Sequence, residues 1–412
     1  MVVRQFKPAT EPRDLNATDK TRANHIVDRV LALDAVTAAA QLSEVMENFQ
    51  GRHRNLLEIF EARARDMEEA FATHPTFSAS QRQLIGAYFL HEYSFEAAAL
   101  FNPSIVAATD QSGAPAGGRR FVLSARAVGE GHVSSLTFRS GSLAADGSLK
   151  LDPTARLAAI PKVIRRTPRP DGEEVELAFD PDTDLSERVI FPVTDAQSNG
   201  IEDARFVPFD TGTEDVFYAT YTAYSGRAIR SELLETRDFL SFRLTPLTGA
   251  AAKNKGMGLF PKRIDGRYAM IARQDNENLY LIYSDDLYNW ESGVAILRPQ
   301  FPWEFVQIGN CGAPIELDEG WLLLTHGVGP VRRYSIGAAL LDKKDPSKVL
   351  ARTREPLLRP ELSEREGYVP NVVYTCGALR QGEKIILPYA VSDTFCSFAS
   401  MEISALLRLM ES

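Results

Sequence analysis

The spacing of apolar residues divides the chain into a helical first quarter and a β-rich remainder. Between Thr21 and Glu69 apolar side chains recur every three or four positions, which predicts two or more amphipathic helices. A second helical stretch is predicted from Ser80, a suitable N-cap residue, to Leu100. Residues 1–19 are polar and contain prolines, so we expect them to form an extended arm.

Beyond Phe101 the pattern changes to short β-branched and aromatic runs broken by Gly, Pro, Asp and Asn, which predicts many short strands. Five apolar runs end in a polar residue: Phe121–Arg126, Phe217–Thr222, Tyr268–Arg273, Trp321–His326 and Lys384–Tyr389. The last four begin about 50 to 65 residues apart, close to the repeat of propeller blades. The first interval is longer and holds an insertion around residues 160–176.

This repeat predicts a mainly β fold, a five-bladed β-propeller over residues 101–412, preceded by an N-terminal arm and α-helical region over residues 1–100. Corresponding strand ends surround the central channel of a propeller. We therefore expect a polar cup made by the ends of the five runs: Arg126, Thr222, Arg273, His326 and Tyr389.

Composition restricts the partners and the compartment. The 412 residues carry a formal net charge of −9, which argues against a nucleic-acid partner. Three widely spaced cysteines do not make a disulfide framework and are typical of a reducing compartment. No apolar leader and no stretch long enough to span a membrane is present, so we predict a cytoplasmic protein without a membrane partner.

The sequence lacks the motifs of several common classes of enzyme. There is no Gly-x-Ser-x-Gly elbow, no Walker loop and no dinucleotide-binding glycine motif, and no His-x-x-x-His pair that would indicate zinc. We therefore predict neither a metal nor a cofactor. Polar and charged residues instead gather in four segments: 198–205, 253–262, 309–334 and 367–393.

A mixture of carboxylates, cations and aromatic rings is typical of carbohydrate sites, and cations also admit an anionic co-substrate such as phosphate. Glu202 and Asp203 are adjacent, and in an extended strand their side chains point to opposite faces. Only one of these two carboxylates is therefore expected to face the site.

The motifs in these segments resemble those of glycoside hydrolase family 130, the β-mannoside phosphorylases and β-mannosidases, over about Phe101 to Leu407. They follow the family's order: Phe101-Asn-Pro-Ser, Gly200-Ile-Glu-Asp-Ala-Arg, Thr236-Arg-Asp-Phe, Asn254-Lys-Gly, Leu259-Phe-Pro-Lys, Ser284-Asp-Asp-Leu, Asn289-Trp, Gly320-Trp-Leu, His326-Gly-Val, Leu340-Leu-Asp, Asp345-Pro and Gly367-Tyr-Val-Pro-Asn-Val. Two positions depart from the family pattern: Ala204 replaces a proline, and Gly256 replaces an aspartate found in many relatives.

The resemblance implies a five-bladed propeller and inversion at the anomeric carbon. It implies that Asp203 is the general acid, with its proton passing through a hydroxyl of the mannosyl ring. Inorganic phosphate would be the co-substrate, held by residues drawn from Arg126, Arg205, Lys255 and His326 with Tyr334. Asn102 and Asp393 match positions that contact the mannosyl unit, and Glu202 and Arg273 are also expected to bind substrate.

We therefore predict an inverting glycoside phosphorylase that cleaves β-mannosidic bonds of a mannose-containing oligosaccharide and releases α-mannose 1-phosphate. One alternative is an inverting β-mannosidase, which would use water and a second carboxylate as base; Lys255, Arg205 and His326 favour phosphate over water. A further alternative is a non-catalytic glycan-binding propeller. The N-terminal helices are expected to serve assembly, which predicts a homo-oligomer.

Overall fold

The computed structural model describes residues 1–7, 21–70, 77–213 and 215–411. It divides into two compact units. The helical unit comprises Met1–Ser94 with Ala155–Ala159, and the β unit comprises Phe95–Thr154 with Ile160–Ser412. Within the described residues no helix is both long enough and apolar enough to span a membrane.

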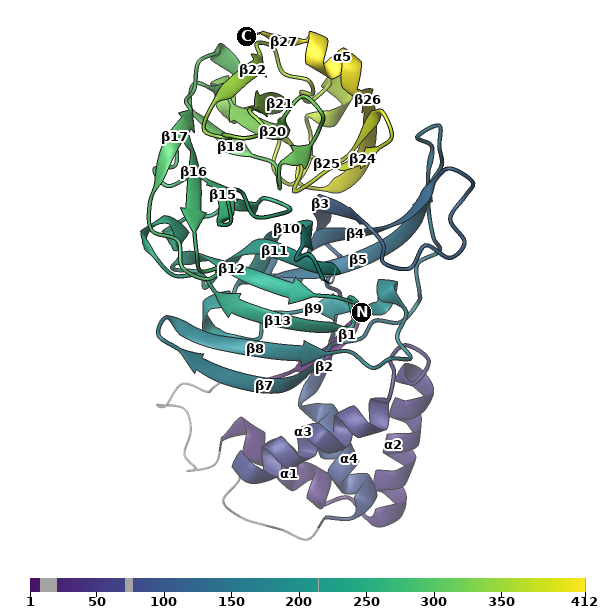
Figure 1. Ribbon diagram of the computed structural model, residues 1–412. Helices are drawn as coiled ribbons and strands as arrows, with labels where there is room; N and C mark the ends of the chain where they lie inside the picture. The colour runs from purple at the N-terminus through teal and green to yellow at the C-terminus, as the bar shows by residue number, and fades with distance from the viewer. Residues whose placement is uncertain (8–20, 71–76, 214, 412) are drawn as a thin grey trace. The chain divides into compact units, whose positions relative to one another are not determined.

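Among its described residues the helical unit has four helices and one strand pair (Figure 1). The helices are α1 (Arg22–Leu31), α2 (Ala35–Phe49), α3 (Leu56–Ala70) and α4 (Ala79–Tyr88). The side chains of Thr21, Asp34 and Ser78 cap α1, α2 and α4 by accepting a hydrogen bond from a backbone N–H of the first turn. The first predicted helical region is therefore confirmed, as three helices.

The second predicted helix is only half right. It begins after Ser78 rather than Ser80 and ends at Tyr88. The next residues form β2 (Leu90–Tyr93), which pairs antiparallel with β1 (Val2–Gln5). Long-range pairing with the N-terminus thus overrides the local helical pattern. Residues 2–5 of the predicted arm form this strand, and residues 8–20 lie outside the described residues.

The described part of the β unit forms four sheets, each made from one continuous part of the chain apart from the short C-terminal strand β27 (Figure 1). The first sheet has eleven strands: β3 (Ala99–Ala107), β4 (Arg119–Val128), β5 (Ser134–Leu143), β6 (Leu149–Leu151), β7 (Lys162–Arg169), β8 (Gly172–Ala178), β9 (Val189–Ile190), β10 (Gly200–Asp210), β11 (Asp215–Tyr224), β12 (Ile229–Thr236) and β13 (Ser241–Pro246). The predicted insertion forms the β7–β8 hairpin, whose second strand pairs with β13.

The other three sheets follow in chain order. One contains β14 (Gly258–Leu259), β15 (Tyr268–Ala272), β16 (Leu279–Ser284) and β17 (Gly293–Leu297). The next contains β18 (Gln307–Asn310), β19 (Ile315–Glu316), β20 (Trp321–Val328), β21 (Tyr334–Leu341), β22 (Val349–Thr353) and β27 (Met410–Glu411). The last contains β23 (Val373–Tyr374), β24 (Leu379–Gln381), β25 (Lys384–Val391) and β26 (Phe395–Glu402), followed by helix α5 (Ile403–Arg408).

All five predicted apolar runs are strands, namely β4, β11, β15, β20 and β25. Each pairs antiparallel with strands on both sides, and most of its residues are buried. The apolar core lies between successive sheets; one cluster, for example, packs Val207 and Leu233 of the first sheet against Met270 and Trp290. A continuous apolar run is what a strand buried on both faces requires.

The last sheet also reaches the first. The backbone N–H of Leu100 donates to the carbonyl of Thr394 (2.9 Å), and that of Cys376 donates to the carbonyl of Pro103 (2.8 Å). Residues at the start of β3 therefore lie beside residues from the C-terminal part of the chain, although nearly 300 positions separate them. This contact brings the two ends of the β unit to one place.

Candidate active site

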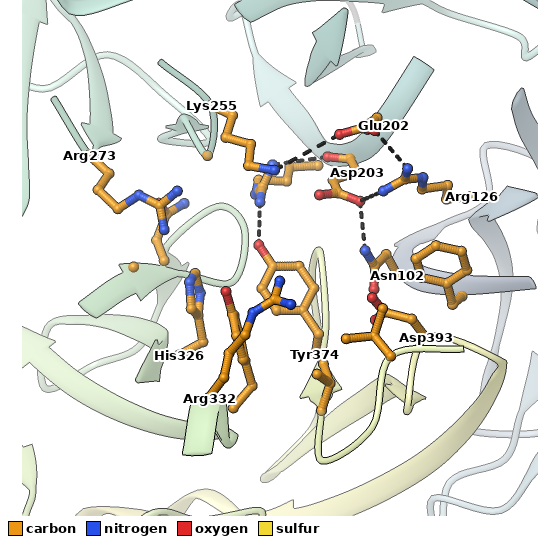
Figure 2. Close-up of a pocket in the computed structure, with 18 of the residues that line it drawn as sticks. Asn102, Arg126, Glu202, Asp203, Lys255, Arg273, His326, Arg332, Tyr374 and Asp393 are labelled. Atoms are coloured by element: carbon orange, nitrogen blue, oxygen red, sulfur yellow. Dashed lines mark hydrogen bonds and ion pairs between the residues drawn. The ribbon is translucent and has the colours of Figure 1, made fainter. Parts of the chain in front are cut away.

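A polar pocket in the β unit collects all ten residues predicted for the site (Figure 2). These are Asn102, Arg126, Glu202, Asp203, Arg205, Lys255, Arg273, His326, Tyr334 and Asp393. Its cavity has a volume of about 270 Å³. Arg332, Tyr368 and Tyr374 also line the pocket. They lie in the predicted polar segments 309–334 and 367–393, but none of them was predicted as a site residue.

The predicted polar cup is only partly correct. Of the five strand ends, Arg126, Arg273 and His326 line the pocket, whereas Thr222 and Tyr389 are not among its lining residues. Thr222 is fully buried on β11, and the hydroxyl of Tyr389 donates a hydrogen bond to Glu364 (3.1 Å). Three of the five predicted strand ends, each from a different sheet, therefore line the site.

Two β-bulges position the side chains of Asp203 and Asn102 in the pocket. The β10–β11 pairing shifts register between Glu202 and Arg205, and the β3–β4 pairing shifts between Phe101 and Ser104. Within these bulges Asp203 and Asn102 adopt left-handed backbone angles, with φ of 55° and 50°. Bulges re-aim side chains in this way.

The bulge overturns the expectation that only one of Glu202 and Asp203 faces the site. Both line the pocket, and each is only 8% exposed. The strict alternation of side chains applies to a regular strand, and the register shift after Glu202 interrupts it.

Asp203 is held by two neighbouring side chains. Asn102 Nδ2 donates a hydrogen bond to Asp203 Oδ1 (2.6 Å), and Arg126 Nη1 approaches the same oxygen (3.5 Å). Arg126 Nη2 also donates to Glu202 Oε1 (2.7 Å), so one guanidinium bridges both carboxylates. Lys255 Nζ lies farther away, 4.0 Å from Glu202 Oε2.

The three carboxyl groups of the pocket differ in their pKa. Burial raises the pKa of Glu202, and the charge of Arg126 only partly offsets this. Burial also acts to raise the pKa of Asp203, but Arg126, then Lys255 and Arg205, outweigh it and lower that pKa. Burial and the nearby charge of Asp203 raise the pKa of Asp393 to about 6. Of the three carboxyl groups, Asp203 therefore ionises most readily, whereas Glu202 and Asp393 bind a proton more readily than an exposed carboxyl group does.

Arg205 secures the floor of the pocket. Its Nη1 donates to the backbone carbonyl of Asp203 (3.0 Å), and its Nη2 donates to the Tyr374 hydroxyl (2.6 Å). The ring of Tyr374 contacts His326 edge-on at a centroid distance of 4.9 Å, and the ring of Tyr334 stacks on His326 at 5.8 Å. Gly309 pairs with His326 across β18 and β20, and a side chain there would overlap the imidazole.

His326 is a neutral imidazole. Burial, together with the positive charges of Arg273 and Arg205, lowers its pKa well below the ordinary value. It can therefore donate one hydrogen bond to an oxyanion without adding charge.

Arg273 is the unusual cation of the pocket. It directly follows β15 and is only 8% exposed, yet within the described residues its guanidinium has no hydrogen-bond or ion-pair partner. Figure 2 shows Arg273, His326 and Lys255 on one side of the pocket and Asn102, Asp203 and Asp393 on the other. A buried, unpaired cation is costly, so this side is prepared for an anion.

Two loops that contribute or contact a lining residue of the pocket share a pair of left-handed backbone angles. Gly131 and His132, between β4 and β5, have φ of 70° and 58°; Val331 and Arg332, between β20 and β21, have φ of 57° and 53°. The first loop supports Tyr368, whose hydroxyl lies 2.7 Å from His132 Nδ1, and the second carries Arg332 into the pocket lining.

Comparison with known proteins identifies the family. A family model of glycoside hydrolase family 130, described as β-1,4-mannooligosaccharide phosphorylase, matches residues 182–412. The chain belongs to glycoside hydrolase family 130. The matched range includes Asp203 and most of the pocket residues, whereas Asn102 and Arg126 precede it.

Individual members of family 130 agree with this assignment. The chain is 35% identical over 224 residues to 1,2-β-oligomannan phosphorylase from Thermoanaerobacter sp. (strain X514), which covers 53% of this chain and 74% of the relative. It is 33% identical over 230 residues to β-1,2-mannobiose phosphorylase from Listeria innocua, covering 54% and 63%. A solved complex named as the Listeria innocua β-1,2-mannobiose phosphorylase with β-1,2-mannobiose superposes with a TM-score of 0.54 at 25% identity, covering 76% of this chain and 92% of that one.

The two departures from the family 130 pattern have visible local consequences. Ala204 is buried inside the β10 bulge, where the Arg205 side chain fixes the preceding carbonyl. Gly256 has φ of 89°, a conformation that suits glycine, and a Cβ built on it would meet only Arg205 Nη2, at 4.0 Å. The missing side chain leaves space beside Arg205 on the pocket wall.

Proposed function

We propose that this chain is an inverting β-mannoside phosphorylase that uses inorganic phosphate and releases α-mannose 1-phosphate. The observation that carries the proposal is the buried guanidinium of Arg273, which has no partner among the described residues and lies opposite the Asp203 carboxylate. Phosphate satisfies such a group with charge-assisted hydrogen bonds, which water cannot match. Family 130 membership supports mannoside phosphorolysis as the reaction class.

The mannosyl unit would lie on the carboxylate side of the pocket. Asn102 and Asp393 supply hydrogen-bonding groups there, and Asn102 Oδ1 is buried without a partner among the described residues. A sugar hydroxyl satisfies an unpaired buried acceptor such as Asn102 Oδ1. Asp203 is the general acid of this proposal.

Phosphate would lie on the opposite side, among Lys255, Arg273 and His326, with Arg205 and Tyr334 beside them. A phosphate oxygen attacks the anomeric carbon from the face opposite the glycosidic oxygen. The bond from that carbon to the glycosidic oxygen breaks, and the oxygen leaves with a proton from Asp203, directly or through a mannosyl hydroxyl. Attack from the opposite face converts the β-linkage into an α-phosphate.

The arrangement gives little support to a hydrolase. An inverting hydrolase needs a second carboxylate, across the sugar from the acid, to activate water. The labelled carboxylates in Figure 2 lie together on one side, and Glu202 is tied to Arg126. The opposite side presents cations, which suit an oxyanion.

The test is to incubate the protein with mannobiose isomers, with and without phosphate, and to identify products and anomeric configuration by NMR. We expect α-mannose 1-phosphate and one free sugar, formed only with phosphate. Equal release of free mannose without phosphate would replace phosphorolysis by hydrolysis. No turnover, with retained sugar binding, would leave a glycan-binding protein. The isomer consumed fastest gives the linkage.

We propose further that residues 101–412 form a five-bladed propeller and are the catalytic domain. Five antiparallel groups support this reading: β3–β6, β10–β13, β14–β17, β18–β22 and β23–β26. The hydrogen bonds from Leu100 to Thr394 and from Cys376 to Pro103 are what closure of such a ring requires. A crystal structure of the chain tests this arrangement directly.

We also propose a cytoplasmic homo-oligomer. Cys311, Cys376 and Cys396 are free thiols, in keeping with a reducing compartment. The helical unit exposes Phe49, Leu57 and Tyr88, which offer apolar area for a second subunit. Light scattering of the intact chain and of a variant in which these three residues are replaced by serine tests assembly, and a monomeric intact chain refutes it.

A further inference from the structure

The adjacent carboxylates of Glu202 and Asp203 share the guanidinium of Arg126. Arg126 Nη2 contacts Glu202 Oε1 at 2.7 Å and Arg126 Nη1 contacts Asp203 Oδ1 at 3.5 Å. Both carboxylates are buried, and the next cation, Lys255, is 4.0 Å from Glu202 and has a half-exposed side chain. The charges of Lys255 and Arg205 also stabilise ionised Asp203, so the charge on this pair is compensated partly by cations that line the proposed phosphate site.

Other ionisable groups face the pair from every element around the pocket. Arg205 belongs to β10, Arg273 follows β15, Arg332 comes from the β20–β21 loop, and Asp393 follows β25. The remaining titratable groups are His326, Tyr334, Tyr368 and Tyr374. His326 is already neutral, and burial raises the pKa of Tyr374, so neither supplies charge near neutral pH.

We propose that Glu202 and Asp203 act as one proton-binding pair, and that phosphate binding loads this pair with a proton from solvent. The inference rests on the proposed phosphorolysis. A phosphate dianion brings two negative charges into a pocket that already holds three carboxylates. It also competes with Glu202 for Lys255, whose long side chain can turn toward the anion.

A bound phosphate dianion should raise the pKa of the Glu202–Asp203 pair. A nearby like charge favours the protonated form of a carboxyl group. Glu202 already has a raised pKa, so it is the easier member of the pair to protonate. Because the two groups are adjacent and share Arg126, their titration belongs to the pair. Glu202 is in this account a positioning residue, since it acts through Asp203.

The proton balance closes over one turnover. The pair takes one proton from solvent when the dianion HPO₄²⁻ binds. That proton passes to the glycosidic oxygen as its bond to the anomeric carbon breaks, and the pair returns to its ionised state. The phosphate's own proton is released to solvent as the mannosyl phosphate leaves as a dianion.

The same coupling would discriminate against water. A water molecule in the phosphate site adds no charge, so the pair stays ionised and Asp203 has no proton to donate. Phosphorolysis is then favoured over hydrolysis at the stage of acid protonation, before any bond to the attacking oxygen forms.

The coupling can be measured by calorimetric titration with sulfate at pH 7 in two buffers of different ionisation enthalpy. Sulfate is a dianion that does not itself titrate near neutrality, so any proton uptake comes from the protein. We expect uptake of about one proton per bound sulfate, and a sulfate affinity that falls about tenfold per unit of pH increase. Sulfate binding without proton uptake would overturn the inference while leaving the phosphate site intact.

Two variants locate the proton. We expect Glu202→Gln to lose the proton uptake on sulfate binding. Asp393→Asn, which likewise removes one pocket carboxylate, should keep it. The reverse pattern would assign the proton to Asp393 and refute the pair. If sulfate does not bind, phosphate at pH 8, where the free ion is mainly the dianion, is the probe. Failure of both anions to bind would refute the phosphate site and the coupling together.

Discussion

Two arginines of the pocket should respond in opposite ways to the same substitution. Arg126 is paired with Glu202 and Asp203, whereas Arg273 has no partner for its guanidinium among the described residues. Methionine keeps much of the volume of either side chain and removes the charge. We expect Arg273→Met to raise the free energy of unfolding and Arg126→Met to lower it.

The magnitudes follow from the different environments. An unpaired buried charge costs several kcal/mol, and partial contact with water at the pocket mouth reduces this, so Arg273→Met should gain about 1–2 kcal/mol. Removing Arg126 takes the bridging cation from two buried carboxylates, and breaking a buried ion pair in this way costs about 3–5 kcal/mol. The loss at Arg126 should shrink below about pH 5, because protonated carboxyl groups no longer need the cation.

The assay is thermal unfolding of both variants with and without phosphate. Phosphate at 100 times its dissociation constant stabilises a binding protein by about 2.7 kcal/mol, and Arg273→Met should lose this increment. Arg267→Met is the control, because Arg267 is exposed and lies over the Tyr283 ring away from the pocket. Destabilisation of Arg273→Met by as much as Arg126→Met, with phosphate stabilisation retained, would refute the reasoning.

Three further outcomes are expected. Asp203→Asn should keep the fold and lose about 10²- to 10⁴-fold in turnover of mannobiose with phosphate; near-normal turnover of the folded variant would remove Asp203 as the acid. Because the pKa of Asp393 is raised from 3.8 to about 6, its ionisation costs stability as pH rises through that window. Asp393→Asn should therefore gain up to about 3 kcal/mol at pH 8 and little at pH 3.5, and a pH-independent difference would contradict this. Val331→Gly should raise stability by up to about 1 kcal/mol in denaturant unfolding, because a β-branched residue is strained at φ of 57°, while Val331→Ala should gain less.

The strand content of the β unit could be predicted because its strands are short and covered on both faces. Trp321–His326, for example, is a continuous apolar run, and β20 is buried throughout. The helix predicted up to Leu100 failed for a non-local reason. Its second half pairs with Val2–Gln5 and then enters β3, and no local pattern reports a partner about 90 residues away.

The members of the site were predictable, but their geometry was not. Motif order brought Asn102, Asp203 and Asp393 together, and the structure places all three in one pocket. The expectation that only one of Glu202 and Asp203 would face the site failed because alternation assumes a regular strand. The unpaired state of Arg273 is likewise a property of its surroundings, which the sequence does not specify.

The backbone around the pocket explains why local rules fail there. Asn102, Asp203 and Asp393 all have left-handed backbone angles, with φ between 49° and 55°. Asparagine and aspartate tolerate this conformation better than other side chains, and their short polar groups then point out of the regular pleat. The same residue types thus serve both the backbone geometry and the proposed sugar contacts.

Ala204 fits this account. A proline at this position would restrict the backbone beside Asp203, and alanine does not. Here Arg205 fixes the Asp203 carbonyl, and the next backbone N–H, of Phe206, donates to Ser104 Oγ at 3.0 Å. Hydrogen bonds on the C-terminal side of the bulge therefore supply the restraint that the ring would give. The position of Asp203 consequently depends on Arg205. Because Arg205 also faces the proposed phosphate site, the same side chain positions the general acid and contributes to anion binding.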